Sequence, residues 1–171
     1  SKTMRLAQSL YEAGHITYMR TDSVHLSTLA LGTAKEEILR EYGENYHKAR
    51  QYQTSSKGAQ EAHEAIRPTY MNVPTAGANT DEKRLYDLIR KRALASQMAD
   101  ALTDTTRMEV TISNSPYIWV ATNEVITFDG FMRVYAQGTD DETEETVTAL
   151  PDMKEGQLLT AEQVSATESF T

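Results

Sequence analysis

The first hundred residues alternate apolar and polar positions with the period of an α-helix in three places. Residues 3–13 form the first stretch, and Gly14 is a natural stop after it. Residues 27–42 form the second. Residues 80 to about 98 form the third, with Thr80 as its expected N-cap. The positions expected to face a core are Met4, Ala7, Leu10 and Tyr11, then Leu31, Ala34, Ile38 and Tyr42, then Leu85, Leu88, Ile89, Arg92 and Ala95.

After residue 103 the period changes to two, which is typical of strands. The alternation begins over 104–112, and strand residues continue over 117–127. The pattern therefore predicts an α+β protein. A helical domain over 1–103 is followed by an antiparallel β segment over 104–171.

Turn signals divide the rest of the β segment. Asp129-Gly130 is a hairpin signal, so a strand is expected over 131–135. Residues 140–145 form an acidic loop, and a turn at 154–156 precedes a last strand over 158–164.

The connections in the helical part are short or polar. Residues 15–19 alternate like a short extended segment, and residues 44–57 are expected to form a loop. A short helical turn is possible over 59–65, and Pro68 then holds the preceding residue away from helical angles. Residues 72–79 form the connection to the third helix.

The net charge of −8 argues at first against a nucleic-acid partner, but its distribution changes that picture. Residues 1–100 carry 14 Lys and Arg against 12 Asp and Glu, whereas residues 101–171 carry 3 against 13. A polyanion should therefore meet the helical part, and the acidic β part should face away from it.

The chain contains no cysteine, which excludes disulfides, thiolate zinc sites and thiol catalysis, and which fits a cytoplasmic protein. No apolar run approaches the roughly 20 residues of a membrane-spanning helix, and no signal peptide is visible, so no membrane partner is expected. The chain does not open with methionine and reads as helix by Thr3, so we expect a piece of a longer protein.

Residues 16–23, with the sequence Ile-Thr-Tyr-Met-Arg-Thr-Asp-Ser, are the richest in chemical groups. In an extended segment, Tyr18 and Arg20 project from the same face. A free phenol has a pKa of about 10 and is a poor nucleophile until its anion is stabilised, and a guanidinium also matches phosphate oxygens. Asp22 either orients Arg20 or caps the next helix, and capping is the more ordinary role. Most tyrosines, however, simply pack their rings in a core.

A second polar cluster covers residues 63–69, with the sequence His-Glu-Ala-Ile-Arg-Pro-Thr. His63 and Arg67 are four residues apart, and Pro68 fixes the backbone after them, so both side chains could reach one phosphate. His63 would then serve as a general acid for a departing alkoxide. The ordinary alternative is a solvated polar turn. His63-Glu64 lacks the spacing of a zinc motif.

Basic residues recur on the third predicted helix, where Lys83, Arg84 and residues 90–92 would form either a phosphate-binding face or a solvent face. The chain contains no P-loop, no dinucleotide-binding glycine motif and no G-x-S-x-G motif.

Together, the two polar clusters resemble the active-site signatures of type IA DNA topoisomerases, in the bacterial DNA topoisomerase I branch. The likeness covers residues 16–23, residues 63–69, the separation of 45 residues between Tyr18 and His63, and the lead-in over 3–14. The stretch Phe-Asp-Gly-Phe at 128–131 also resembles the segment that follows in topoisomerase I.

This resemblance implies a role for each matching residue. Tyr18 would attack one DNA strand and form a 5′-phosphotyrosyl link, which the free 3′-hydroxyl later reverses without ATP. Another strand would pass through the gap, so negatively supercoiled DNA is relaxed. Arg20 would hold the scissile phosphate and the phenolate, and His63 is the histidine of the second signature. Supporting or DNA-binding roles fall to Thr17, Thr21, Asp22, Glu64 and Arg67.

The resemblance also implies parts that this chain lacks. The family's Toprim domain, which binds Mg²⁺, has no counterpart here, and neither do the C-terminal zinc ribbons. The β segment matches only part of the family's arch. The fragment is therefore expected to hold no metal and to be inactive alone, with DNA and the other domains of the same chain as its partners.

Two other functions remain open from the residues. A non-enzymatic module for single-stranded nucleic acid would use Tyr46, Tyr52 and Tyr70 as stacking groups. A protein-binding module would use the acidic β part.

Overall fold

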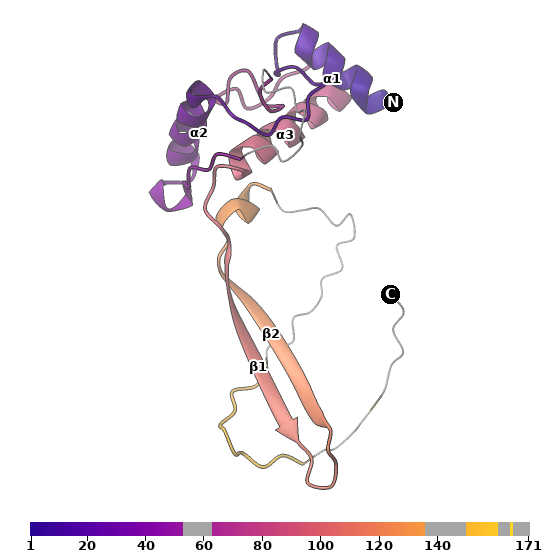
Figure 1. Cartoon of the computed structure of the whole chain (residues 1–171), viewed down its shortest axis with the longest axis vertical. Coiled ribbons are helices and arrows are strands. Elements are labelled where there is room, and N and C mark those ends of the chain that lie inside the picture. Colours follow the sequence, from indigo (N-terminus) through magenta and orange to yellow (C-terminus); the bar gives the residue numbers. More distant parts are fainter. Residues whose placement is uncertain (53–62, 136–149, 161–164, 166–171) are drawn as a thin grey trace. The chain divides into compact units, whose positions relative to one another are not determined.

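The computed structural model describes residues 1–52, 63–135, 150–160 and 165. It contains three α-helices, two short 3₁₀-helices and a two-stranded antiparallel sheet (Figure 1). The predicted α+β class is therefore confirmed. The elements, in chain order, are α1 (Lys2–Glu12), α2 (Thr28–Glu41), η1 (Glu44–Tyr46), α3 (Thr80–Ala95), β1 (Leu102–Thr111), β2 (Ile118–Phe128) and η2 (Gly130–Arg133).

The chain divides into two compact units, and each is described by itself. The first unit combines Ser1–Asp104 with Val125–Thr143, and the second combines Thr105–Glu124 with Glu144–Thr171. All helices belong to the first unit, whereas each strand of the hairpin begins or ends in it. The domain boundary near residue 103 stays a prediction.

The first two helices begin and end where the sequence pattern places them. The Ser1 and Ser27 side chains accept hydrogen bonds from backbone amides in the first turns of α1 and α2, at 3.4 and 3.3 Å. Gly14 and Gly43 follow the two helices with φ of 75° and 94°, which is the left-handed region that glycine tolerates.

The third helix begins at Thr80 as predicted, but its N-cap and its C-terminal end differ from the prediction. Its N-cap is Asn79 instead of Thr80, because the Asn79 side chain accepts a hydrogen bond from the Glu82 amide at 2.9 Å. Helix α3 ends at Ala95 rather than near Met98, with Ser96 as its C-cap.

One hydrophobic cluster joins α1 and α3 around residues 16–19, and these two helices lie side by side in Figure 1. The expected apolar face of α1 is partly wrong, because Met4 and Tyr11 are exposed while Ala7 and Leu10 are buried. The buried members of the cluster are Ala7, Leu10, Ile16, Met19, Ala76 and Tyr86.

A second cluster packs α2 against the end of α3. The predicted apolar face of α3 is wrong at Leu88 and Arg92, which are exposed, whereas Arg90 and Tyr86 are buried. The buried residues of this cluster are Ala34, Ile38, Met71, Ala93, Leu94 and Met98.

The region expected to be a loop after α2 is more regular than predicted. It begins with η1, and His47 then forms an antiparallel bridge with Met98. The buried Gln97 side chain bonds both to the Arg50 amide, at 3.0 Å, and to the Arg50 carbonyl, at 2.9 Å. Residues 53–57 of the expected loop, and 59–62 of the expected helical turn, lie outside the described residues.

The hairpin signal at Asp129-Gly130 is wrong, as is the strand expected over 131–135. Gly130 begins η2 with φ of 49°, and the Phe131 amide donates to the Ala99 carbonyl at 2.9 Å. Phe131 then packs against the second hydrophobic cluster. A long-range contact within the first unit is therefore found in place of the expected hairpin.

The later expectations have mixed outcomes. The turn at 154–156 is confirmed, because the Gln157 amide donates to the Lys154 carbonyl at 3.0 Å. The last strand is wrong over 158–160, which have no regular structure, while 161–164 and the acidic loop lie outside the described residues. Among the helices that the structure describes, we find none with the length and apolar character needed to cross a membrane.

Candidate active site

The structure brings the two polar clusters of the sequence together. Ile16 and Pro68 form an antiparallel bridge, the Thr17 amide donates to the Arg67 carbonyl at 2.9 Å, and the Thr69 amide donates to the His15 carbonyl at 2.9 Å. The segment expected to be extended over 15–19 is thus paired with residues that lie about 50 positions later.

Tyr18 and His63 lie against each other as a result of this pairing. Their ring centroids are 5.4 Å apart with an interplanar angle of 33°, within the range of a favourable aromatic contact. The Tyr11 ring of α1 also contacts Tyr18, edge-on and with centroids 5.4 Å apart. Tyr18 is half-buried at the margin of the first hydrophobic cluster.

Arg20 and Asp22 lie in the exposed part of the same segment. The helix-capping role considered for Asp22 is wrong, since Ser27 caps α2. No ion pair between Asp22 and Arg20 is present in the described part of the chain.

The backbone between Asp22 and α2 is held by hydroxyl side chains. The Thr21 hydroxyl accepts a hydrogen bond from the Ser23 amide at 3.0 Å, and the Ser23 hydroxyl accepts one from the His25 amide at 3.2 Å. Such local bonds favour turns over helix, so they keep α2 from starting earlier.

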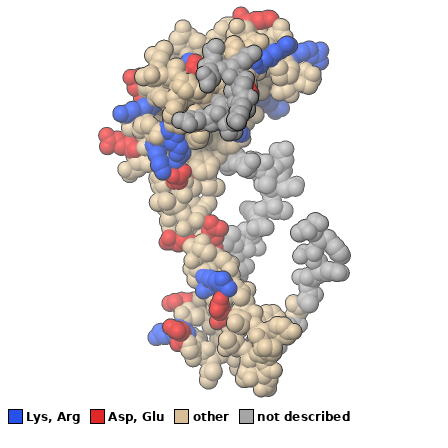
Figure 2. Space-filling model, viewed as in Figure 1, with Lys and Arg blue, Asp and Glu red and all other residues tan. Residues whose placement is uncertain are grey.

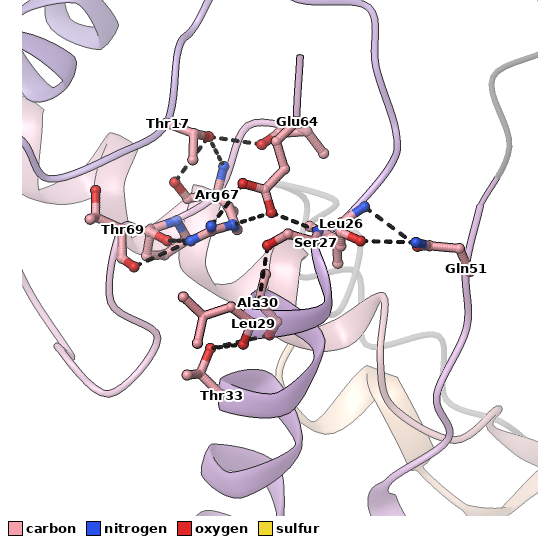
Figure 3. A network of polar contacts seen from close by, with 12 residues as sticks. Thr17, Leu26, Ser27, Leu29, Ala30, Thr33, Gln51, Glu64, Arg67 and Thr69 are labelled. Atoms are coloured by element: carbon pink, nitrogen blue, oxygen red, sulfur yellow. Dashed lines mark hydrogen bonds and ion pairs between the residues drawn. The ribbon is translucent and has the colours of Figure 1, made fainter. Parts of the chain in front are cut away.

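Glu64 and Arg67 form an ion pair that the sequence did not predict. Arg67 is only 8% exposed, and its Nε and Nη2 donate to the two Glu64 carboxylate oxygens at 2.9 and 2.8 Å. Nη1 donates to the Pro68 carbonyl at 2.8 Å and to the Thr69 carbonyl at 3.2 Å (Figure 3). Four of the five N–H donors of this guanidinium are therefore bound inside the protein. This differs from the expectation that Arg67 and His63 reach one phosphate together.

The Glu64 carboxylate also accepts a hydrogen bond from the Ser27 amide at 2.7 Å. Burial alone would raise the pKa of Glu64, but the hydrogen bonds from Arg67 and Ser27 outweigh burial and lower its pKa. The side chain therefore stays ionised beside the N-terminus of α2, where a negative charge is favourable.

The Thr17 hydroxyl makes the third connection between the clusters. It donates to the Ala65 carbonyl at 2.8 Å and accepts a hydrogen bond from the Arg67 amide at 2.9 Å (Figure 3). We refer to Thr17, Ser27, Glu64, Ala65 and Arg67 as the inter-motif network. No signal in the sequence identified its geometry, because its members come from three separate segments.

The electrostatics of the described surface are mixed. On the face shown in Figure 2, Lys and Arg are interspersed with Asp and Glu. Several cations of the described residues are paired, as in Lys48–Asp100 at 2.6 Å and Lys91–Asp87 at 2.8 Å. The predicted basic face of α3 is also divided, because Arg90 is buried.

Within the described ranges, no group of three or more His, Cys, Asp or Glu residues could hold a metal ion.

Comparison with known proteins decides the family of this chain. The sequence profile described as DNA topoisomerase matches residues 1–171. The chain belongs to the DNA topoisomerase family. The resemblance to the bacterial topoisomerase I branch is likewise confirmed, by relatives named DNA topoisomerase 1.

Two relatives illustrate this likeness within the topoisomerase family. DNA topoisomerase 1 of Zymomonas mobilis is 44% identical over 178 residues, which cover 100% of this chain and 15% of the relative. DNA topoisomerase 1 of Synechococcus elongatus is 44% identical over 173 residues, which cover 96% of this chain and 19% of the relative. The chain thus spans less than a quarter of the length of these topoisomerases.

The fold is also similar to a solved topoisomerase. The structure of full-length topoisomerase I from Thermotoga maritima matches with a TM-score of 0.69 and 36% identity, covering 90% of this chain and 25% of that protein.

Proposed function

We propose that this chain is the part of a type IA DNA topoisomerase that carries the nucleophile, in a longer protein that relaxes negatively supercoiled DNA without ATP. The observation that supports this function best is the contact of the Tyr18 and His63 rings at 5.4 Å, between residues 45 positions apart. The match of residues 1–171 to the DNA topoisomerase profile also supports this function.

The proposed reaction exchanges one phosphoester bond for another. The Tyr18 phenol loses its proton and its oxygen attacks a DNA phosphorus atom. A bond forms between this oxygen and phosphorus, the bond from phosphorus to the 3′-oxygen breaks, and the 3′-oxygen gains a proton. After another strand has passed through the break, the 3′-hydroxyl attacks the phosphotyrosyl link and restores both groups. Bond types and protons balance, so no energy source is consumed.

Arg20 and His63 are proposed to serve this exchange in different ways. Arg20 is exposed in the same segment as Tyr18, where its permanent charge would hold the scissile phosphate and stabilise the phenolate. The His63 ring lies against the Tyr18 ring, and we propose that His63 moves a proton at the attacking or leaving oxygen. Thr21 and Asp22 are proposed to support the backbone and charge around Arg20.

The metal and the DNA are proposed to meet this chain within the complete protein. Mg²⁺ would be bound by the Toprim domain of that protein, as the resemblance to type IA topoisomerases implies. Single-stranded or negatively supercoiled DNA and the other domains are the proposed partners, in the cytoplasm. We expect the 171-residue chain alone, with Mg²⁺, to leave a supercoiled plasmid unrelaxed.

The decisive experiment traps the covalent intermediate. The complete gene product is incubated with a single-stranded oligonucleotide labelled at its 3′ end, denatured with detergent and separated on a gel. Wild-type protein should carry the label, whereas Tyr18→Phe should carry none while its affinity for the oligonucleotide stays within about twofold. Tyr11→Phe is the matched control, since it removes the hydroxyl of the neighbouring ring and should leave the labelled band in place.

A labelled band of normal intensity with Tyr18→Phe would refute the proposed nucleophile. The alternative, a module that only binds nucleic acid, predicts affinity without any labelled band in either protein.

A further inference from the structure

The inter-motif network links the two residues proposed to carry the chemistry through their immediate neighbours in the chain. Thr17 precedes Tyr18, and Glu64 follows His63. The Thr17 hydroxyl bonds to the backbone of Ala65 and Arg67, so the segment that carries Tyr18 is fixed to the loop that carries His63.

The charged part of the network fixes that loop from its other side. Arg67 binds both oxygens of Glu64 and two carbonyls of the following residues, and Glu64 binds the first turn of α2 through the Ser27 amide. The Arg67 guanidinium donates four hydrogen bonds, two to a carboxylate and two to backbone carbonyls, and Arg67 is 8% exposed, so little of it is available to a DNA phosphate. The network therefore serves to hold the backbone in place.

We propose that Thr17, Glu64 and Arg67 are positioning residues that set the separation and angle of the Tyr18 and His63 rings for strand cleavage. This inference rests on the function proposed above. Reacting groups must be held within a fraction of an ångström of their productive arrangement, and a misplacement of about 1 Å can cost on the order of a hundredfold in rate. A network of neutral and charge-assisted hydrogen bonds on both sides of the site meets that need.

Thr17 offers the sharpest test because its hydroxyl can be removed without a change of shape. Thr17→Val deletes the hydroxyl and keeps the volume, whereas Thr17→Ser keeps the hydroxyl. In the complete gene product, single-turnover formation of the labelled adduct gives a cleavage rate at saturating oligonucleotide and the concentration for half-saturation. We expect Thr17→Val to slow cleavage by roughly 10- to 100-fold with half-saturation within about twofold of wild type. Thr17→Ser should restore the rate to within about threefold.

Thr33→Val is the matched control. Thr33 lies on α2, and its hydroxyl also donates to backbone carbonyls, of Leu29 at 3.1 Å and Ala30 at 3.2 Å (Figure 3). Among the described residues, its hydroxyl makes no hydrogen bond to either polar cluster. This variant should cleave at the wild-type rate. If the Thr17 hydroxyl had only a structural role, Thr17→Val would reduce the fraction of folded, active protein but not the cleavage rate of that fraction. The cleavage rates of Thr17→Val and Thr33→Val would then be the same.

Glu64→Gln gives a second test should Thr17→Val fail to fold. The amide keeps the shape of the side chain but loses the charge that Arg67 pairs with, so cleavage should slow at saturation by about 3- to 30-fold while half-saturation is unchanged. If Glu64→Gln raised the oligonucleotide concentration for half-saturation and left the cleavage rate unchanged, the inference would be overturned in favour of direct DNA contact.

The outcomes separate this inference from the proposed function. If Tyr18→Phe abolishes the adduct while Thr17→Val and Glu64→Gln cleave at the wild-type rate, the positioning role is refuted and the nucleophile stands. If Tyr18→Phe retains the adduct, the proposed function itself fails.

Discussion

Replacing Arg90 with methionine should destabilise the protein more than any surface change on the same helix. Arg90 is 7% exposed and Glu37 is 3% exposed, and Nη2 of Arg90 lies 2.6 Å from a Glu37 carboxylate oxygen. Arg90 also donates to the Met71 carbonyl at 3.0 Å and to Glu41 at 3.2 Å. Removing the guanidinium leaves a buried carboxylate and a carbonyl with fewer partners.

The magnitude follows from the cost of breaking a buried ion pair, which is about 3–5 kcal/mol when one partner is lost. The lower end applies here, because Arg40 still binds both Glu37 oxygens, at 3.0 and 2.7 Å. Burial raises the pKa of Glu37, but the hydrogen bonds and charges around it, including Arg40 and Arg90, outweigh burial and lower its pKa. We therefore expect Arg90→Met to lower the free energy of unfolding by about 3 kcal/mol. Each kcal/mol lowers the Tm of a protein of this size by about 2–4 °C, so the Tm should fall by about 6–12 °C.

Urea unfolding of the 171-residue chain, followed by far-ultraviolet circular dichroism, measures this loss. Lys91→Met is the matched control, because the neighbouring Lys91 pairs with Asp87 at 2.8 Å on the exposed face and should cost less than about 1 kcal/mol. The double variant Glu37→Met/Arg90→Met leaves no unpaired charge between these two positions, so it should be more stable than Arg90→Met alone. A loss below about 1 kcal/mol for Arg90→Met, or a double variant less stable than Arg90→Met, would refute the reasoning.

Three further predictions concern other contacts. Because the pKa of Glu64 in the folded protein lies below its ordinary value of 4.5, the carboxylate stabilises the protein above pH 4.5, and this contribution is lost as the pH falls below it. In urea unfolding from pH 7 to pH 3, Glu64→Gln should therefore lose less stability than wild type. Identical pH profiles of stability would contradict this. Gly130→Ala should destabilise strongly, because φ is 49° and a Cβ would collide with a backbone carbonyl, whereas Gly14→Ala meets open space and should cost less in the same unfolding assay; equal losses would argue against the close approach. Tyr46→Phe removes the hydroxyl that donates to Asp129 at 2.7 Å and should lower the Tm in thermal unfolding, so an unchanged Tm would count against that bond.

The helical boundaries were predictable where the signals are local. Helices α1 and α2 follow an apolar period and stop before glycines, and both signals lie within the segment itself. The N-cap of α3 differs from the prediction by one residue, because Asn79 and Thr80 are both good caps and only the path of the chain decides between them.

The buried charges were not predictable from periodicity. Arg90 was assigned to a basic surface, yet its partner Glu37 lies 53 positions earlier, and only the packing of α2 near α3 brings them together. The Asp129-Gly130 signal failed for the same reason, since Asp129 bonds to Tyr46, 83 positions away.

The candidate site was likewise predictable in its residues but not in its long-range contacts. The sequence identified Tyr18 and His63 as candidates from residue type and spacing. Their ring contact, and the use of Arg67 within the protein, depend on the bridge between Ile16 and Pro68, which no local pattern encodes.

The return of the chain after the hairpin has a consequence for synthesis on the ribosome. Phe131 and Val134 pack against the cluster formed by α2 and α3, but they emerge only after the 102–128 hairpin has been made. Until residues 131–134 have left the ribosome, that apolar cluster lacks the contacts of Phe131 and Val134. The order in which the segments leave the ribosome therefore makes the helical part depend, for its completion, on a stretch encoded after the strands.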